Sequence, residues 1–299
     1  MYVFYTGRAM RHNYLNNRDI LKEIHKSKST YCSFQKAEYA QFDLIVHDIS
    51  EINKKAVTEA RKNRADRLAR DAYDVAVALA QEQKTDKPKQ DTFAIKHTDI
   101  DKMDLIFRVM TWDHIPIVEP KKVEVEEDSL LETEYDDEPA VVAPTKYVKV
   151  NFPPFQHWKF KEEDSDELAC VGKSHWMGGI KTGKYSRDHG AMTNKLALMF
   201  MKLCERYATR SNWRGYTYND EMRSQALLQL SQIGLQFDES KSQNPFAYYT
   251  AAITNSFTRV LNIEKRNQNL RDDILQMNNL NPSYTRQNEW SGGGSHSDD

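Results

Sequence analysis

The stretch from Tyr248 to Arg266 carries side chains suited to contacts with nucleic acid. Amides and hydroxyls can hydrogen-bond to base edges, basic groups can neutralise phosphates, and an aromatic ring can stack on an exposed base. The candidate nucleic-acid contacts are Tyr248, Tyr249, Asn255, Thr258, Arg259, Asn262, Lys265 and Arg266, with Arg271 continuing the basic stretch. A helix face that is exposed to solvent is also polar, so the pattern alone does not distinguish a solvated face from one that binds nucleic acid.

Three amphipathic helices that could position these side chains are expected from Asn194 onward. Apolar residues recur at three- and four-residue steps, which places each set on one helix face. The three expected buried faces are Leu196, Met199, Phe200, Leu203 and Tyr207; Met222, Ala226, Leu230, Ile233 and Phe237; and Phe246, Tyr249, Ile253, Phe257 and Val260.

Helix starts are indicated by two local signals. Thr217 and Asp220 have the spacing of an N-terminal capping pair for the second helix. Asn244 is a suitable N-cap for the third, because Pro245 follows it at the first helical position, where a missing N–H costs nothing.

The second helix is expected to expose a polar face with little net charge, formed by Glu221, Ser224, Gln225 and Gln232. Contact with solvent and docking to a partner both explain such a face.

Charge is distributed unevenly along the 299 residues, although the net charge is only −2. Nine carboxylates and no basic residue lie between Glu124 and Glu138, so this segment is predicted to be a solvated acidic linker. The remainder is net positive, which allows a polyanionic partner.

Composition excludes several classes of protein. Mean hydropathy is −0.77 and no run of about 18 apolar residues occurs, so neither a membrane span nor a signal peptide is expected, and we expect a cytoplasmic protein. Cys32, Cys170 and Cys204 are too far apart to predict a disulfide framework or a zinc site. No nucleotide-binding loop, metal site or nucleophile with its base is found, so no cofactor, metal or enzymatic activity is expected.

The first half of the chain is less regular. Residues Ser50 to Gln83 lack Gly and Pro and predict a long helix, either a solvated structural helix or an arm that contacts nucleic acid. The segments 42–49 and 103–112 indicate short strands or buried turns. The glycine-containing segment Phe155 to Lys184 is predicted to be irregular, and the end of the chain after Trp290 to be flexible.

One pattern is far more specific than these. Between Phe237 and Phe257 the sequence has the form F-D-E-x-K-x-x-N-P-x-A-Y-x-T-x-A-x-x-N-x-F. This pattern resembles the late-transcription sigma factors of tailed bacteriophages, and residues 221–259 resemble region two of the sigma-70 family without a gap. A shorter likeness to the same phage proteins involves Asn13, Tyr14, Asn16 and Asn17.

The resemblance implies a mainly α fold, in which a helical region-two domain carries a large, partly irregular N-terminal insertion, between about Ser27 and Asp188, and an acidic linker. The expected organisation is a sigma-like segment (1–26), an inserted mixed region (27–120), the acidic linker (121–145), an irregular connection (146–190), the region-two domain (191–275) and a tail (276–299).

The resemblance also implies roles for single residues. Contact with the clamp helices of the largest subunit of the host bacterial RNA polymerase core would fall on Glu221, Ser224, Gln225 and Leu227, and recognition of the upstream edge of the −10 element on Asn255 and Thr258. The tryptophan pair with which the family props open the melted base pair falls on Ala251 and Ala252. Tyr248 or Tyr249 would have to substitute, or melting would rely on easily deformed AT-rich DNA.

These likenesses favour a phage late sigma factor, which would act in the cytoplasm of the infected host and direct polymerase to TATA-like −10 elements of late promoters. A phage sliding clamp and a coactivator are further partners of the family, although the clamp-binding motif is not found at the C-terminus. The alternatives are a sigma-like polymerase-binding regulator without promoter-opening activity and a virion structural or RNA-binding protein.

Overall fold

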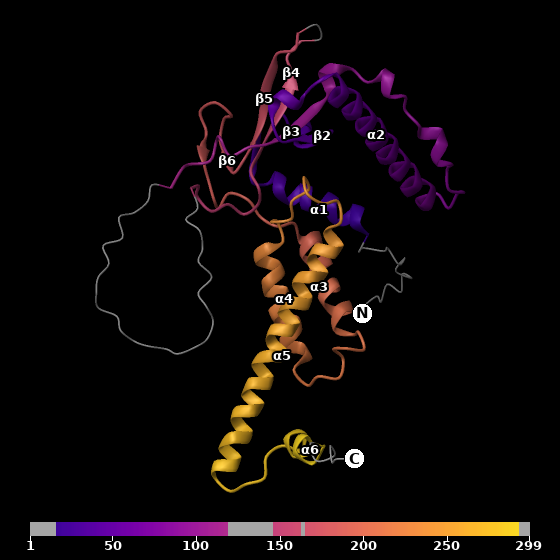
Figure 1. The fold of residues 1–299 in the computed structure, drawn as a ribbon. Helices are drawn as coiled ribbons and strands as arrows, with labels where there is room; N and C mark the ends of the chain where they lie inside the picture. Colours follow the sequence, from indigo (N-terminus) through magenta and orange to yellow (C-terminus); the bar gives the residue numbers. More distant parts are fainter. Residues whose placement is uncertain (1–15, 119–145, 163–164, 293–299) are drawn as a thin grey trace, which may run out of the picture. The chain divides into compact units, whose positions relative to one another are not determined.

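Helices make up most of the regular structure, so the mainly helical prediction is confirmed at that level (Figure 1). The structure, a computed structural model, describes residues 16–118, 146–162 and 165–292. The α-helices are α1 (Asn17–Ser29), α2 (Lys54–Glu82), α3 (Asn194–Ala208), α4 (Asn219–Ile233), α5 (Pro245–Met277) and α6 (Tyr284–Gly292). The strands are β1 (Cys32–Phe34), β2 (Leu44–Val46), β3 (Ile106–Met110), β4 (Phe155–Phe160), β5 (Leu168–Ser174), β6 (Trp176–Met177) and β7 (Lys184–Tyr185).

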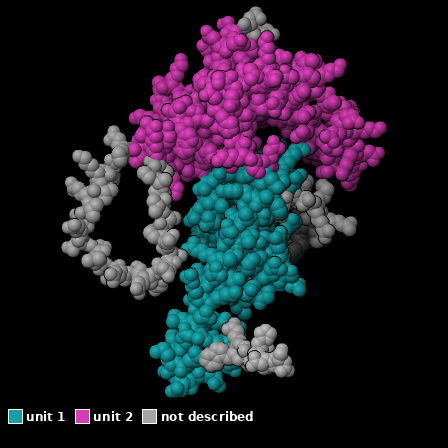
Figure 2. Space-filling model, in the orientation of Figure 1, with its two compact units in different colours: residues 1–23, 194–237, 244–299 teal, residues 24–193, 238–243 magenta. Residues whose placement is uncertain are grey.

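The chain divides into two compact units, and each is built from separate stretches of sequence (Figure 2). Unit 1 comprises residues 1–23, 194–237 and 244–299, and unit 2 comprises residues 24–193 and 238–243. The second stretch of unit 2 is the short loop Asp238–Gln243, which interrupts unit 1 between α4 and α5.

Unit 2 contains a five-stranded sheet in the order β1-β5-β4-β3-β2. Strands β2 and β3 are parallel, while the other neighbours are antiparallel. The segments 42–49 and 103–112 therefore contain strands, which the sequence had not distinguished from turns. Long helix α2 confirms the helix expected between Ser50 and Gln83.

Alanines allow helix α2 to approach its neighbours closely. Ala60 and Ala65 are buried together with Leu105, Phe107 and Phe160 in one apolar cluster. The Asn53 side chain caps the helix by accepting hydrogen bonds from the backbone N–H groups of its first turn.

The prediction that Phe155 to Lys184 is irregular is wrong, because β4, β5, β6 and β7 lie there. The central strand β4 is difficult to predict from the sequence because two of its buried residues, Gln156 and His157, are polar. Gln156 accepts a hydrogen bond from Trp158 Nε1 at 3.1 Å, and His157 lies 3.0 Å from Arg108 Nε. Hydrogen bonds satisfy these polar groups, so they can be buried. The strand therefore lacks the alternation of apolar and polar residues by which a strand is predicted from sequence.

A buried ionic cluster lies on the sheet of unit 2. The guanidinium group of Arg108 is held between the rings of Phe42 and Phe155, at 3.7 and 3.8 Å from their centroids. Lys28 donates to both carboxylate oxygens of Glu239 at 2.8 Å, and Arg108 Nη1 lies 3.9 Å from the same carboxylate. Although burial favours the neutral acid, the charges of Lys28 and Arg108 hold the pKa of Glu239 well below its ordinary value.

Unit 1 is held together by the packing of α3, α4 and α5. All five expected apolar residues of α3 are buried, as are Met222, Ala226 and Leu230 of α4. Ile233 and Phe246 are only half-buried. The expected capping pair at Thr217 is wrong, since α4 begins at Asn219 and Tyr218 occupies the cap position without a side-chain cap. The Asn219 amide instead donates to the carbonyls of Ala208 and Trp213, which fixes the preceding loop.

The region predicted as a tail from residue 276 contains the end of α5 and helix α6. Ser283, which precedes α6, donates to both carboxylate oxygens of Asp272 in α5, through its backbone N–H at 2.8 Å and its hydroxyl at 2.7 Å. Asn13, Tyr14, the acidic linker and residues 293–299 lie outside the described residues.

Candidate nucleic-acid and polymerase interface

Helix α5 begins where the sequence predicts, with Pro245 as its first residue. Asn244 Oδ1 accepts a hydrogen bond from the backbone N–H of Ala247 at 3.1 Å, which confirms the expected cap. A second amide, Asn17 of α1, accepts from the backbone N–H of Phe246 at 3.1 Å. Two of the N–H groups that a helix start leaves without partners are therefore satisfied by side chains.

The side of α5 opposite its buried face is polar and exposed. Ile253, Phe257 and Val260 face the core and are at most 4% exposed. The exposed residues on the opposite side are Asn255, Thr258, Arg259, Asn262, Lys265 and Arg266. They recur at three- and four-residue steps and form one continuous stripe along the helix, as predicted.

The cations of this stripe are available for a partner. Arg259, Lys265 and Arg266 form no ion pair with any carboxylate of the described residues. From Tyr248 to Arg266 the stripe is about 27 Å long, at about 1.5 Å rise per residue. Since phosphates on one strand of DNA recur every 3.4 Å or so, this length matches about eight nucleotides.

The two neighbouring tyrosines have different environments. Tyr249 is fully buried, its hydroxyl donates to the carbonyl of Gly234 at 2.6 Å, and its ring packs edge-on against Phe200. The prediction that Tyr249 contacts nucleic acid is therefore wrong, since its hydrogen bond and ring are both used in the core. Tyr248 is half-buried against Phe237, at 5.6 Å between ring centroids, and is the tyrosine that borders the exposed stripe.

The two alanines onto which the resemblance to sigma factors would map a tryptophan pair differ in exposure. Ala251 is exposed and Ala252 is half-buried. Ala251 lies one helical turn from both Tyr248 and Asn255, so the stripe carries a methyl group between its aromatic ring and its first amide. Tyr248 is the nearest aromatic residue along this side of α5.

The exposed face of α4 includes one apolar residue that sequence analysis missed. Glu221 and Ser224 are exposed, and Gln225 and Leu227 are half-buried. Leu228 is 53% exposed and lies seven residues after Glu221, at the centre of the same face. Leu227 projects toward the flank of the helix, so the apolar contribution to this face comes mainly from Leu228, and the i to i+7 spacing could have indicated it.

The loop Asp238–Gln243 lies in the middle of the Phe237–Phe257 pattern and belongs to unit 2. Glu239 is paired with Lys28 in the buried ionic cluster, whereas Asp238 accepts hydrogen bonds from the backbone N–H and hydroxyl of Ser240. Glu239 of the pattern therefore has a structural role in this chain.

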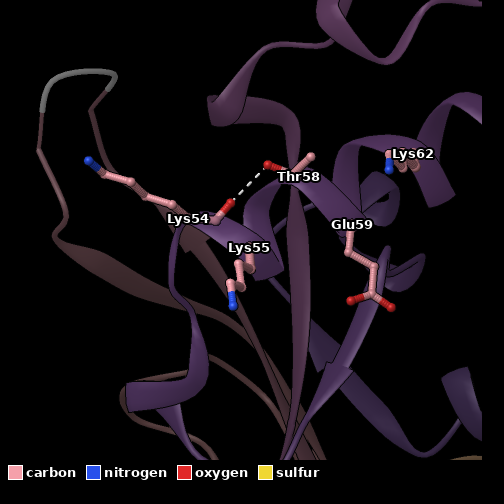
Figure 3. A pocket seen from close by; sticks show the side chains of 5 residues that line it. All are labelled: Lys54, Lys55, Thr58, Glu59 and Lys62. Carbon is pink, nitrogen blue, oxygen red and sulfur yellow. Dashed lines mark hydrogen bonds between the residues drawn. The ribbon is translucent and has the colours of Figure 1, made fainter.

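A shallow hollow on the first turns of α2 is lined by Lys54, Lys55, Thr58, Glu59 and Lys62. Figure 3 shows the three ammonium groups pointing in different directions, while the hydroxyl of Thr58 donates to the Lys54 carbonyl at 2.9 Å. The hollow therefore lacks convergent groups that could hold a small ligand.

No group of three or more His, Cys, Asp or Glu side chains within residues 16–118, 146–162 and 165–292 is arranged to hold a metal ion. Within the same ranges, no helix has both the length and the apolar character needed to cross a membrane. Comparisons with protein-family models, curated proteins and solved structures return no match to this chain.

Proposed function

We propose that this chain is a promoter-specificity subunit of the sigma type, encoded by a phage, that binds the host RNA polymerase core and directs it to TATA-like −10 elements. The exposed stripe of α5 carries the proposal, because it combines hydrogen-bonding groups and unpaired cations on one side of a well-anchored helix. Asn255 and Thr258 would recognise base edges, while Arg259, Lys265 and Arg266 would contact phosphates.

The exposed face of α4 is proposed as the polymerase-binding surface. Glu221, Ser224 and Gln225 give it polar groups, and Leu228 gives it an apolar centre that a helical partner can cover. This face lies on a different helix from the DNA-binding stripe, so binding of polymerase and of promoter can be separated by mutation.

Transcription reconstituted from purified full-length protein, host core polymerase and a late-promoter template tests the proposal. Asn255→Ala and Thr258→Ala should abolish promoter opening while polymerase binding is retained, because both side chains are exposed and make no core contact. Leu228→Asp should weaken polymerase binding. Gln236→Asp, at an exposed residue just beyond the end of α4, is the matched control and should bind polymerase like the unmodified chain.

A polymerase-binding regulator without promoter-opening activity is the second candidate, and the exposed methyl group of Ala251 favours it. Stacking of a base on an aromatic ring contributes about 1 to 3 kcal/mol, which alanine cannot supply. If polymerase binds normally but permanganate footprinting detects no melted promoter DNA with any late promoter, this second function replaces the first. Failure to bind polymerase at all would exclude both.

A further inference from the structure

Unit 2 contains two stretches of chain that carry basic residues and no acidic ones. Residues 146–161 contain four lysines, and residues 168–187 contain three lysines and one arginine, while neither stretch contains Asp or Glu. Of the residues that separate these stretches, Glu162, Asp166 and Glu167 lie between β4 and β5.

The second stretch ends in a hairpin with a well-defined shape. Strands β6 and β7 pair Trp176 with Tyr185 and Met177 with Lys184. Trp176 Nε1 donates to the carbonyl of Gly179 at 3.2 Å, and the hydroxyl of Ser33 donates to the carbonyl of Gly178. A Cβ atom at Gly183 would lie 2.6 Å from two backbone carbonyl oxygens, so only glycine fits the close approach there.

The first stretch adjoins this hairpin. The hydroxyl of Tyr185 donates to the carbonyl of Lys149 at 3.4 Å, and the Asn151 amide donates to the carbonyl of Arg187 at 3.5 Å. Six cations of these two stretches, which we name the hairpin surface, are Lys146, Lys149, Lys173, Lys181, Lys184 and Arg187.

The cations of the hairpin surface lack acidic partners. None forms an ion pair with a carboxylate of the described residues, and five of the six are exposed. At the β4–β5 turn, by contrast, Lys161 is paired with Glu167 at 2.9 Å and Lys102 with Asp166 at 2.9 Å. Basic residues are thus paired with carboxylates at the β4–β5 turn, whereas those of the hairpin surface are not.

Aromatic rings lie among these cations. Lys173 Nζ lies 4.8 Å from the centre of the Trp176 ring, and Lys146 Nζ lies 5.8 Å from that of Tyr147. Trp112 packs on Tyr147 with 5.1 Å between centroids and remains 40% exposed. Unpaired cations interleaved with partly exposed rings are the combination that binds phosphates and stacks unpaired bases.

We propose that the hairpin surface binds the sugar-phosphate backbone of single-stranded nucleic acid, with Lys181 and Lys184 contacting phosphates and Trp112 stacking on a base. The exposed glycines Gly178 and Gly179 leave room at the tip for a backbone to approach. This site is separate from the α5 stripe and does not depend on a sigma function.

Binding of a fluorescent single-stranded DNA of about 20 nucleotides to the full-length chain tests the proposal, with duplex DNA and RNA of the same sequence as parallel probes. The background variant Arg259→Ala/Lys265→Ala/Arg266→Ala removes the cations of the α5 stripe. In that background, Lys181→Glu/Lys184→Glu should weaken single-strand binding by about tenfold and reduce the salt dependence, with a slope change of about 1.4 for two phosphate contacts.

Lys54→Glu/Lys62→Glu is the matched control, because it reverses the same number of charges on exposed residues of unit 2. It should change binding by less than about threefold, since distant surface charges are screened at physiological salt. Equal effects of the two double variants, with both folded by circular dichroism, would overturn the proposal.

Trp112→Ala distinguishes stacking from simple charge attraction. It should weaken binding of single strands while leaving duplex binding unchanged, because bases in a duplex are not free to stack on a side chain. Equal binding of duplex and single strands, together with no effect of Trp112→Ala, would contradict single-strand recognition. The RNA probe shows whether the site distinguishes ribose from deoxyribose. Binding of either single strand that is weakened by Lys181→Glu/Lys184→Glu supports the proposal, and binding of neither would overturn it.

Discussion

Lys28 contacts both carboxylate oxygens of Glu239 at 2.8 Å, although 211 residues separate the two in the sequence. Both side chains are buried, so removing either one leaves the other as a buried charge without a partner.

The first prediction concerns this pair. Glu239→Gln should lower the free energy of unfolding by about 3 to 5 kcal/mol, because it leaves the buried charges of Lys28 and Arg108 without their carboxylate. Urea denaturation monitored by tryptophan fluorescence measures this. Lys241→Ala, in the same loop but exposed, is the control and should change stability by less than about 0.5 kcal/mol.

Adding Lys28→Met to Glu239→Gln should cost less than the two single changes summed, because each single change removes the same interaction. Strict additivity would show that the pair contributes no coupling energy.

A second prediction separates the two tyrosines of α5. Tyr249→Phe should destabilise the chain by about 1 to 3 kcal/mol, since it removes the hydroxyl that satisfies the buried carbonyl of Gly234. Tyr248→Phe should have little effect on stability. Thermal unfolding of both variants measures the difference, and equal losses would refute the assignment of the two side chains.

A third prediction concerns the cations of the α5 stripe. If Arg259, Lys265 and Arg266 contact phosphates of duplex DNA, each Ala substitution should reduce the slope of log K against log salt by about 0.9. The affinity loss should be similar for all sequences, because phosphate contacts do not distinguish bases. A loss confined to promoter DNA would instead indicate base contacts by these residues.

A fourth prediction concerns stability at low pH. Burial lowers the pKa of His114 to about 4 and that of His175 to about 3, from an ordinary value of 6.5. The unfolded chain therefore binds protons between pH 6.5 and these values, while the folded chain does not. Stability is present in full above pH 6.5 and falls as pH is lowered through this window, with a slope of about 1.4 kcal/mol per pH unit for each histidine.

Thermal unfolding measured from pH 7.5 to 4.5 checks this expectation. His175→Asn should make the decline shallower, because asparagine does not titrate and tolerates the positive φ of 53° at this position. His97→Asn makes the same substitution at an exposed histidine and serves as the matched control. Identical slopes in all three proteins would exclude His175 as a source of the pH dependence.

The features predicted correctly from sequence are local ones. The start of α5 follows from Asn244 and Pro245 alone, because a cap and a first-turn proline act within one helical turn. The exposed side of α5 follows from its periodicity. The confusion of Tyr249 with Tyr248 arose because adjacent residues lie about 100° apart on a helix, so both can border a polar face.

The sheet and the buried ionic cluster depend on contacts between distant residues. Strand β1 pairs with β5, about 140 residues later, and both are short segments without regular alternation. Glu239 has the sequence context of an exposed loop residue, and only the folded chain shows that Lys28 and Arg108 are its partners. A single sequence gives no signal for such pairs.

The alternation of the two units along the chain determines the order in which they can be completed during synthesis. Asn17 leaves the ribosome long before Phe246, whose backbone N–H it accepts, and at about 5 to 20 residues per second the delay is on the order of 10 to 50 seconds. Lys28 and Arg108 are likewise synthesised well before Glu239, the carboxylate with which they pair. Neither unit can therefore fold completely until most of the chain has been translated.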